Sequence, residues 1–243
     1  SRDSISECNV VLNTIAAEAF KEACDRLEKA DDFEMAVHDL IKEYAIDHQR
    51  IVFNGNGYAP EWAEEAKRRG LPNLPSMVDA IPALTTDKAV KLFEEFHVFT
   101  KTELESRAEI QYEIYAKAVN IEAKTMIDLA TKQIIPAVVR YTTVLADSVN
   151  TVRAVGDIDV SVQLELLKKC SALLKTTNSA MKNLSDVVAK VSEIPEGRER
   201  AIYCKDIVCK AMTELRTPVD ELEMLVDKSM WPMPSYGDLI FEV

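Results

Sequence analysis

Few side chains in this sequence have the types and spacing that catalysis or metal binding requires. Glu94 and His97 form an E-x-x-H pair, in which residues three apart share one helix face, as the ligands of di-iron helical bundles do. Such a site needs a second E-x-x-H pair and further glutamates, and the sequence supplies neither. The other histidines, His38 and His48, form no H-E-x-x-H motif. The sequence therefore predicts no metal site within this chain, and we expect all three histidines to be surface or packed helical residues.

Phosphate binding and covalent catalysis find equally little support. Gly55-Asn56-Gly57 is similar to the start of a dinucleotide-binding loop, but the third glycine would fall at Pro60 and no strand precedes it. We interpret the segment as a helix end, where glycine and asparagine tolerate positive φ. No G-x-S-x-G motif occurs, and no cysteine has an obvious basic or histidine neighbour that would make it nucleophilic. We therefore assign no catalytic, cofactor-binding or metal-binding residue.

The composition indicates a globular, acidic and helix-rich protein. Of 243 residues, 47% are apolar and 29% charged, and only six are glycine. Such a chain is long enough to bury a core, and sheet-rich proteins usually need more turn glycines. The formal net charge of −12 repels phosphate backbones, so we expect no nucleic-acid partner.

The same sequence predicts a cytoplasmic protein that does not enter a membrane. Its longest apolar run, Ile134–Val139, has six residues and contains Pro136, whereas a span needs about 20. The N-terminus has no basic region followed by an apolar one, so secretion has no support. The cysteines are odd in number and form no C-x-x-C pair, so we expect buried, reduced thiols. They are Cys8, Cys24, Cys170, Cys204 and Cys209.

Residues 1–99 are predicted to form a region of short helices. The first helix spans Cys8–Lys29 and repeats apolar residues at four-residue steps on one face. These residues are Val11, Ile15, Ala19, Ala23 and Leu27. The second helix begins at Asp31, with Glu34 as its capping-box partner, and turns Val37, Leu40, Ile41 and Tyr44 inward. Pro60 starts a third helix that Gly70 ends. An irregular connection at 71–86, with one helical turn at 77–80, leads to a helix at 87–96.

Residues 100–229 are predicted to form three long antiparallel helices. Thr100 and Glu103 form a capping box, and helical periodicity then continues without a glycine to Gly156. Pro136 predicts a kink at 131–135, since proline removes a helical hydrogen bond. Apolar residues at three- and four-residue steps mark a second helix over 167–191 and a third over 201–225, the latter kinked at Pro218. Short connections make this an up-down-up bundle.

The remaining residues, 230–243, are predicted to be an extended tail that is not helical. The tail concentrates large apolar side chains in Met230–Gly237 and Leu239–Phe241. An unfolded tail would avoid such side chains, so we expect this one to dock on a surface. The predicted fold is thus all-α, with a short-helix region, a three-helix bundle and an extended docking tail.

Several segments in order along the chain are similar to the C-terminal region of type III glutamine synthetases. The most distinctive are NVVLNTIAAEA at 9–19, RIVFNGNGY at 50–58 and MWPMPSYGDL at 230–239. FTKTELESR at 99–107 and NIEAKTM at 120–126 also fit. The resemblance covers essentially the whole chain.

The resemblance implies a full-length ligase that makes glutamine from ATP, glutamate and ammonia, with magnesium or manganese at the phosphates. It also implies a dodecamer whose catalytic residues lie in an upstream domain, so none of them is assigned here. The first helix resembles one that completes that domain, and it would expose an apolar face when separated from it. Ser1 and the early helix likewise predict that the chain is excised from a longer protein.

We therefore expect a helical accessory or assembly domain, inactive by itself, whose partners are the upstream catalytic domain and neighbouring subunits. We expect no cofactor bound within this fragment. The alternative is a free-standing helical bundle that binds another protein through its long helices. Both uses predict the same apolar stripes, so the sequence does not separate them.

Overall fold

The computed structural model describes residues 4–241 and contains only helices, turns and loops over that range. This confirms the predicted all-α class. The chain divides into two compact units, Ser1–Ala108 and Glu109–Val243, with the division inside a long helix. No helix of the described part is long and apolar enough to cross a membrane.

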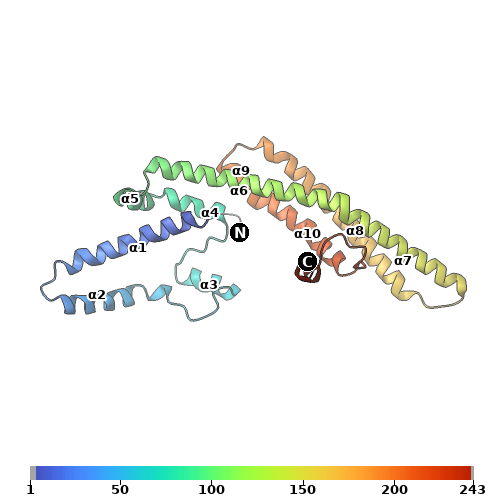
Figure 1. The fold of residues 1–243 in the computed structure, drawn as a ribbon, viewed down its shortest axis with the longest axis horizontal. Helices are drawn as coiled ribbons and strands as arrows, with labels where there is room; N and C mark the ends of the chain where they lie inside the picture. The colour runs from blue at the N-terminus through green and yellow to red at the C-terminus, as the bar shows by residue number, and fades with distance from the viewer. Residues whose placement is uncertain (1–3, 242–243) are drawn as a thin grey trace. The chain divides into compact units, whose positions relative to one another are not determined.

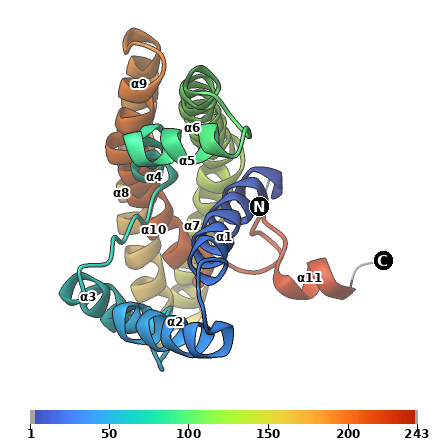
Figure 2. The same ribbon diagram turned by 90° about the vertical axis from the view of Figure 1, so that its left-hand side faces the viewer.

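The first unit is built from short helices around a small core (Figure 1). They are α1 (Ser6–Leu27), α2 (Phe33–Asp47), α3 (Pro60–Arg68), α4 (Met77–Ala80) and α5 (Asp87–Glu95), with 3₁₀ turns at Gln49–Ile51 and Ile81–Thr85. Both ribbon views show α1 and α2 side by side, and α1 also contacts α5 (Figures 1 and 2). The buried apolar side chains are Leu40, Ala66, Val78, Ile81 and Phe93.

Helix ends in this unit follow the sequence closely, with one correction. Pro60 is the first residue of α3, and Gly70, at φ 67°, ends it as predicted. The cap of α2 is Asp32 rather than Asp31, because the Asp32 carboxylate accepts a hydrogen bond from the Met35 amide. Glu34 therefore stands one position too early to complete a capping box. Two adjacent aspartates made the choice ambiguous in the sequence.

The apolar faces predicted for α1 and α2 are only partly buried. On α1, Thr14 is buried and donates a hydrogen bond to the Val10 carbonyl, whereas Ile15 and Ala19, on the predicted apolar face, are exposed. On α2, Leu40 is buried but Ile41 is 63% exposed. The first unit is too small to cover every apolar position that its helices present.

The loop after α2 is held by Arg69, the residue at the end of α3. The Arg69 guanidinium donates to the carbonyls of Val52 and Arg50 at 2.7 and 3.2 Å and lies over the Phe53 ring. Phe53 stacks on Trp62 with ring centroids 4.4 Å apart. A Cβ at Gly55 would lie 2.5 Å from the Phe53 ring. The prediction that Gly55 and Gly57 adopt positive φ is wrong. Gly55 is instead needed for space, since any side chain there would collide with the Phe53 ring.

The second unit contains the predicted up-down-up bundle. Its first rod is α6 (Lys101–Leu129) followed by α7 (Ile135–Val155), its second is α8 (Ser161–Ala189), and its third is α9 (Arg198–Tyr203) followed by α10 (Cys209–Glu223). A capping box starts α6: the Thr100 amide donates to the Glu103 carboxylate, and the Glu103 amide donates to the Thr100 hydroxyl. The Thr100 amide and hydroxyl both donate to the Glu103 carboxylate, and these two bonds lower its pKa.

Two wide π turns interrupt the long rods. The first, Ala130–Ile134, lies where Pro136 predicted a kink, since the proline has no amide to continue the α-helical pattern. The second, Cys204–Val208, has no proline near it. The irregularity of the third rod is this π turn and not the kink predicted at Pro218. Helix α10 continues through Pro218, which is buried.

The bundle core consists of two clusters along its length. The first joins α6 to α8 and to the third rod, and small side chains on α6 let the helices approach closely. It includes Ala116, Ala123, Leu184, Cys204, Val208 and Leu215. The second joins α7, α8 and α10 and includes Ile134, Val138, Cys170, Leu222 and Val226. Met230 and Trp231 pack against this second cluster, so the start of the tail docks on the bundle.

The tail is not wholly extended, which corrects the prediction. Residues Tyr236–Phe241 form the short helix α11. Ser235 and Asp238 exchange hydrogen bonds: the Ser235 hydroxyl and amide both donate to the Asp238 carboxylate at 2.7 Å, and the Asp238 amide donates to the Ser235 hydroxyl. The two bonds to the carboxylate, together with one from Lys228, lower the pKa of Asp238 to about 2. The capping pattern follows Pro234 directly, so the prolines of the tail precede the helix and do not prevent it.

Leu222 and Met224 provide a test of the second cluster. Leu222 is 0% exposed and Met224 is 83% exposed, although only one residue separates them. We expect Leu222→Ala to destabilise the bundle by about 2–5 kcal/mol and Met224→Ala by less than about 0.5 kcal/mol. Urea denaturation followed by circular dichroism measures both. Equal losses for the two variants would contradict this placement of α10.

Candidate functional site

Glu94 and His97, the one pair with metal-ligand spacing, both have structural roles. The Glu94 carboxylate accepts a hydrogen bond from the Lys101 amide at 3.1 Å and so helps to cap α6. His97 has φ 52° and lies two residues beyond the end of α5. Its amide donates to the Glu94 carbonyl, and the Val98 amide donates to the Phe93 carbonyl. This is a Schellman motif, in which His97 occupies the position usually taken by glycine.

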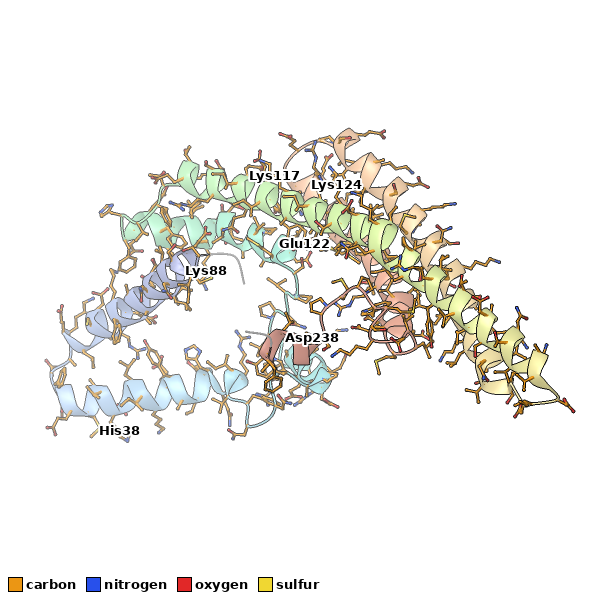
Figure 3. All side chains as sticks on the ribbon, turned by 45° about the vertical axis from the view of Figure 1, so that its right-hand side comes forward. His38, Lys88, Lys117, Glu122, Lys124 and Asp238 are labelled. Carbon is orange, nitrogen blue, oxygen red and sulfur yellow. The ribbon has the colours of Figure 1, made fainter. Side chains whose placement is uncertain are left out.

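The other candidate residues do not converge on a site. His38 is exposed (Figure 3) and contacts the neighbouring Asp39. His48 caps the end of α2. No group of three or more histidine, cysteine or acidic residues in the described part could hold a metal ion. Catalytic, cofactor-binding and metal-binding residues therefore remain unassigned.

The cysteines are free thiols, but the prediction that they are buried is wrong for two of them. Cys170 and Cys204 lie in the two bundle clusters, and burial raises the pKa of the Cys204 thiol to about 11. Cys8 and Cys24 are exposed on α1. Apolar periodicity identified α1 as an amphipathic helix but did not show how much of its apolar face this chain covers.

The described residues form one polar pocket of substantial size inside the bundle unit. Its volume is about 490 Å³, and it is lined by α6, α8, the 3₁₀ turn Lys190–Glu193 and the start of α9. Polar side chains come from Asn120, Lys124, Ser185, Ser192 and Arg200, and the apolar floor includes Val188 and Val191. Arg200 is fixed there because Nε and Nη2 both donate to the Ile194 carbonyl, at 3.0 and 2.7 Å. Sequence reasoning missed this pocket, since its walls come from three separated segments.

A second candidate surface is the apolar face of the first unit. Leu12, Ile15 and Phe20 are exposed on α1, and Phe20 is 73% exposed. Phe33, Met35, Ile41 and Ile46 are exposed on α2. Exposed apolar side chains at this density mark interaction surfaces in soluble proteins.

Comparison with known proteins shows which family this chain is similar to. Residues 36–153 match the family described as the glutamine synthetase C-terminal domain. The chain is also 33% identical over 240 residues to the type-3 glutamine synthetase of Dictyostelium discoideum, a match that covers 96% of this chain. The chain belongs to the glutamine synthetase family. This confirms the resemblance found in the sequence.

Two further relatives agree with this assignment. The glutamine synthetase of Butyrivibrio fibrisolvens is 34% identical over 214 residues, covering 88% of this chain and 31% of the relative. The glutamine synthetase of Bacteroides fragilis is 28% identical over 228 residues, covering 91% and 31%. The chain spans 33% of the Dictyostelium protein, so it corresponds to about a third of each glutamine synthetase that it matches.

Substitution of His97 distinguishes its structural role from metal binding. Glycine adopts a left-handed conformation without the steric cost that other residues bear, so His97→Gly should stabilise the chain by about 0.5–1 kcal/mol. His48 also ends a helix, but its φ is −101°, so His48→Gly should give no gain. Thermal denaturation compares the two variants. A loss of stability for His97→Gly, or metal uptake that this variant abolishes, would contradict the capping role.

Proposed function

We propose that this chain is the C-terminal helical accessory domain of a type III glutamine synthetase. The observation that carries the proposal is the match over 96% of this chain but only 33% of the type-3 relative. The full-length enzyme would join glutamate and ammonia at the expense of ATP, with magnesium or manganese ions at its active site. This fragment would supply structure and assembly contacts rather than catalytic groups. It would act in the cytoplasm.

The apolar face of α1 supports contact with an upstream domain. Fully burying a leucine, isoleucine or phenylalanine side chain contributes about 1.5–3 kcal/mol, so leaving Leu12, Ile15 and Phe20 in water is costly. A catalytic domain that precedes residue 1 would be covalently attached beside this helix. We infer that α1 completes that domain, and that residues 1–99 connect it to the bundle at 100–229.

The long rods support an assembly role. Helices α6 and α8 each have 29 residues, which corresponds to about 44 Å at 1.5 Å per residue. Ile110, Ile114 and Ile121 are exposed along α6. They recur at helical spacing and give this rod a partly apolar outer stripe, suited to contact with neighbouring subunits. The family resemblance makes a dodecamer the expected assembly.

The test compares this chain with the full-length gene product. We expect ATP-dependent glutamine synthesis and γ-glutamyl transfer only from the full-length protein, which light scattering should show to be a large oligomer. The isolated chain should show neither activity, because the described part contains no cluster of titratable groups suited to metal-assisted phosphoryl chemistry. Activity in the isolated chain, or an inactive full-length protein, would contradict the proposal.

A matched pair of substitutions in the full-length protein tests the role of α1. Phe20→Asp places a charge on the exposed apolar face, whereas Glu22→Asp changes an exposed position on the same helix without changing its charge. We expect Phe20→Asp to lower activity at least tenfold or to prevent assembly, and Glu22→Asp to leave both unchanged. Full activity and assembly of Phe20→Asp would show that another surface contacts the catalytic domain.

A further inference from the structure

We propose that the pocket between α6, α8 and α9 binds a small organic anion, whose phosphate or carboxylate group meets Lys124 and Arg200 while its body lies on the apolar floor. The pocket lies wholly within the bundle unit, at residues 120–127, 185–192 and 200. Its volume of about 490 Å³ falls in the range typical of small-molecule sites. The inference does not depend on the proposed enzymatic context.

The charge of the pocket is opposite to that of the chain. The formal net charge is −12, yet the residues that line the pocket include two cations and no carboxylate. Lys124 has no ion-pair partner among the residues that the structure describes. Glu122 lies two residues away, which places it on the opposite side of α6, about 200° around the helix (Figure 3). An anion would therefore find an uncompensated ammonium group here.

The nearest carboxylates line a smaller pocket beside this one, and each already forms an ion pair. Glu113 pairs with Lys117 at 2.8 Å, and Glu196 pairs with Arg200 Nη1 at 3.1 Å. Both glutamates line that neighbouring pocket, not the larger one. Figure 3 shows Lys117 on the same helix as Lys124. The Glu196 side chain is 70% exposed, so solvent weakens its effect on Arg200.

Arg200 is positioned in advance for an anion. Its side chain is 23% exposed, and three of its N–H groups are used by the Ile194 carbonyl and Glu196. A guanidinium group has five N–H donors, so two remain. Because the used donors fix the plane of the group, little conformational entropy is lost when a ligand binds.

Asn120 adds an unsatisfied polar group at the wall that the two pockets share. Its Oδ1 atom is buried and has no hydrogen-bond partner among the described residues. An unpaired buried polar atom is destabilising, so a ligand that pairs with this group gains affinity. Rotation of the amide by 180° exchanges Oδ1 and Nδ2 and presents a donor to an anion. The hydroxyl groups of Ser185 and Ser192 supply further polar contacts at the opposite wall.

The probe is phenyl phosphate, which combines a dianionic head group with an apolar body. We expect a saturable titration in ¹H–¹⁵N correlation spectra of this chain, with shifts confined to residues around 120–127 and 185–200. Inorganic phosphate and phenol, each lacking one half of the probe, should bind at least about fivefold more weakly. Phenylacetate tests a carboxylate head group: tighter binding than phenyl phosphate would assign the site to carboxylates, and weaker binding would assign it to phosphate esters.

Two variants locate the binding. Lys124→Gln removes the unpaired charge and should weaken phenyl phosphate binding about fivefold to tenfold. Lys210→Gln removes a charge from an exposed position on α10, outside the pocket, and should leave affinity unchanged. Unchanged spectra elsewhere show that each variant is folded. Non-saturable shifts, equal binding by Lys124→Gln, or equal affinity for either half of the probe would overturn the proposal.

Discussion

Close packing of helices against the small side chains of α6 determines how the rest of the bundle is arranged. Ala116 and Ala123 are buried where α8 and the third rod approach, and larger residues at these positions would hold the rods apart. The larger side chains come from the partners, with Leu184 on α8 and Leu215 on α10. This asymmetry leaves the polar side of α6 free to line the pocket at Asn120 and Lys124.

Much of the bundle could be predicted because its signals are local. Thr100 and Glu103 satisfy each other's amides within one turn, and Pro136 removes a hydrogen bond at a known position. The π turn at Cys204–Val208 has no such signal, since nothing in its residue types disfavours an α-helix. The left-handed His97 was missed for a related reason, because φ at a helix end depends on how the next segment of the chain packs.

Predictions failed where burial depended on tertiary contacts. Periodicity placed Ile15 and Ile41 on apolar faces, but it could not show that the first unit lacks enough residues to cover them. The sequence contains no catalytic motif from which a site residue could be assigned, and it did not predict the pocket. The wall at 120–127 is separated from the wall at 185–200 by 58 residues along the chain, and lysine, serine and asparagine at such distances form no recognisable pattern.

The π turn at Ala130–Ile134 lies at the boundary between the two core clusters: Ala130 belongs to the first and Ile134 to the second. A π turn accommodates one more residue than an α-helical turn, so it resets the register of the residues after it. Straightening this turn into a regular α-helix without removing a residue would rotate α7 by about 100° relative to α6. Val138 would then leave its cluster. The wide turn therefore takes up one residue of the rod while the face of α7 that meets the second cluster stays the same.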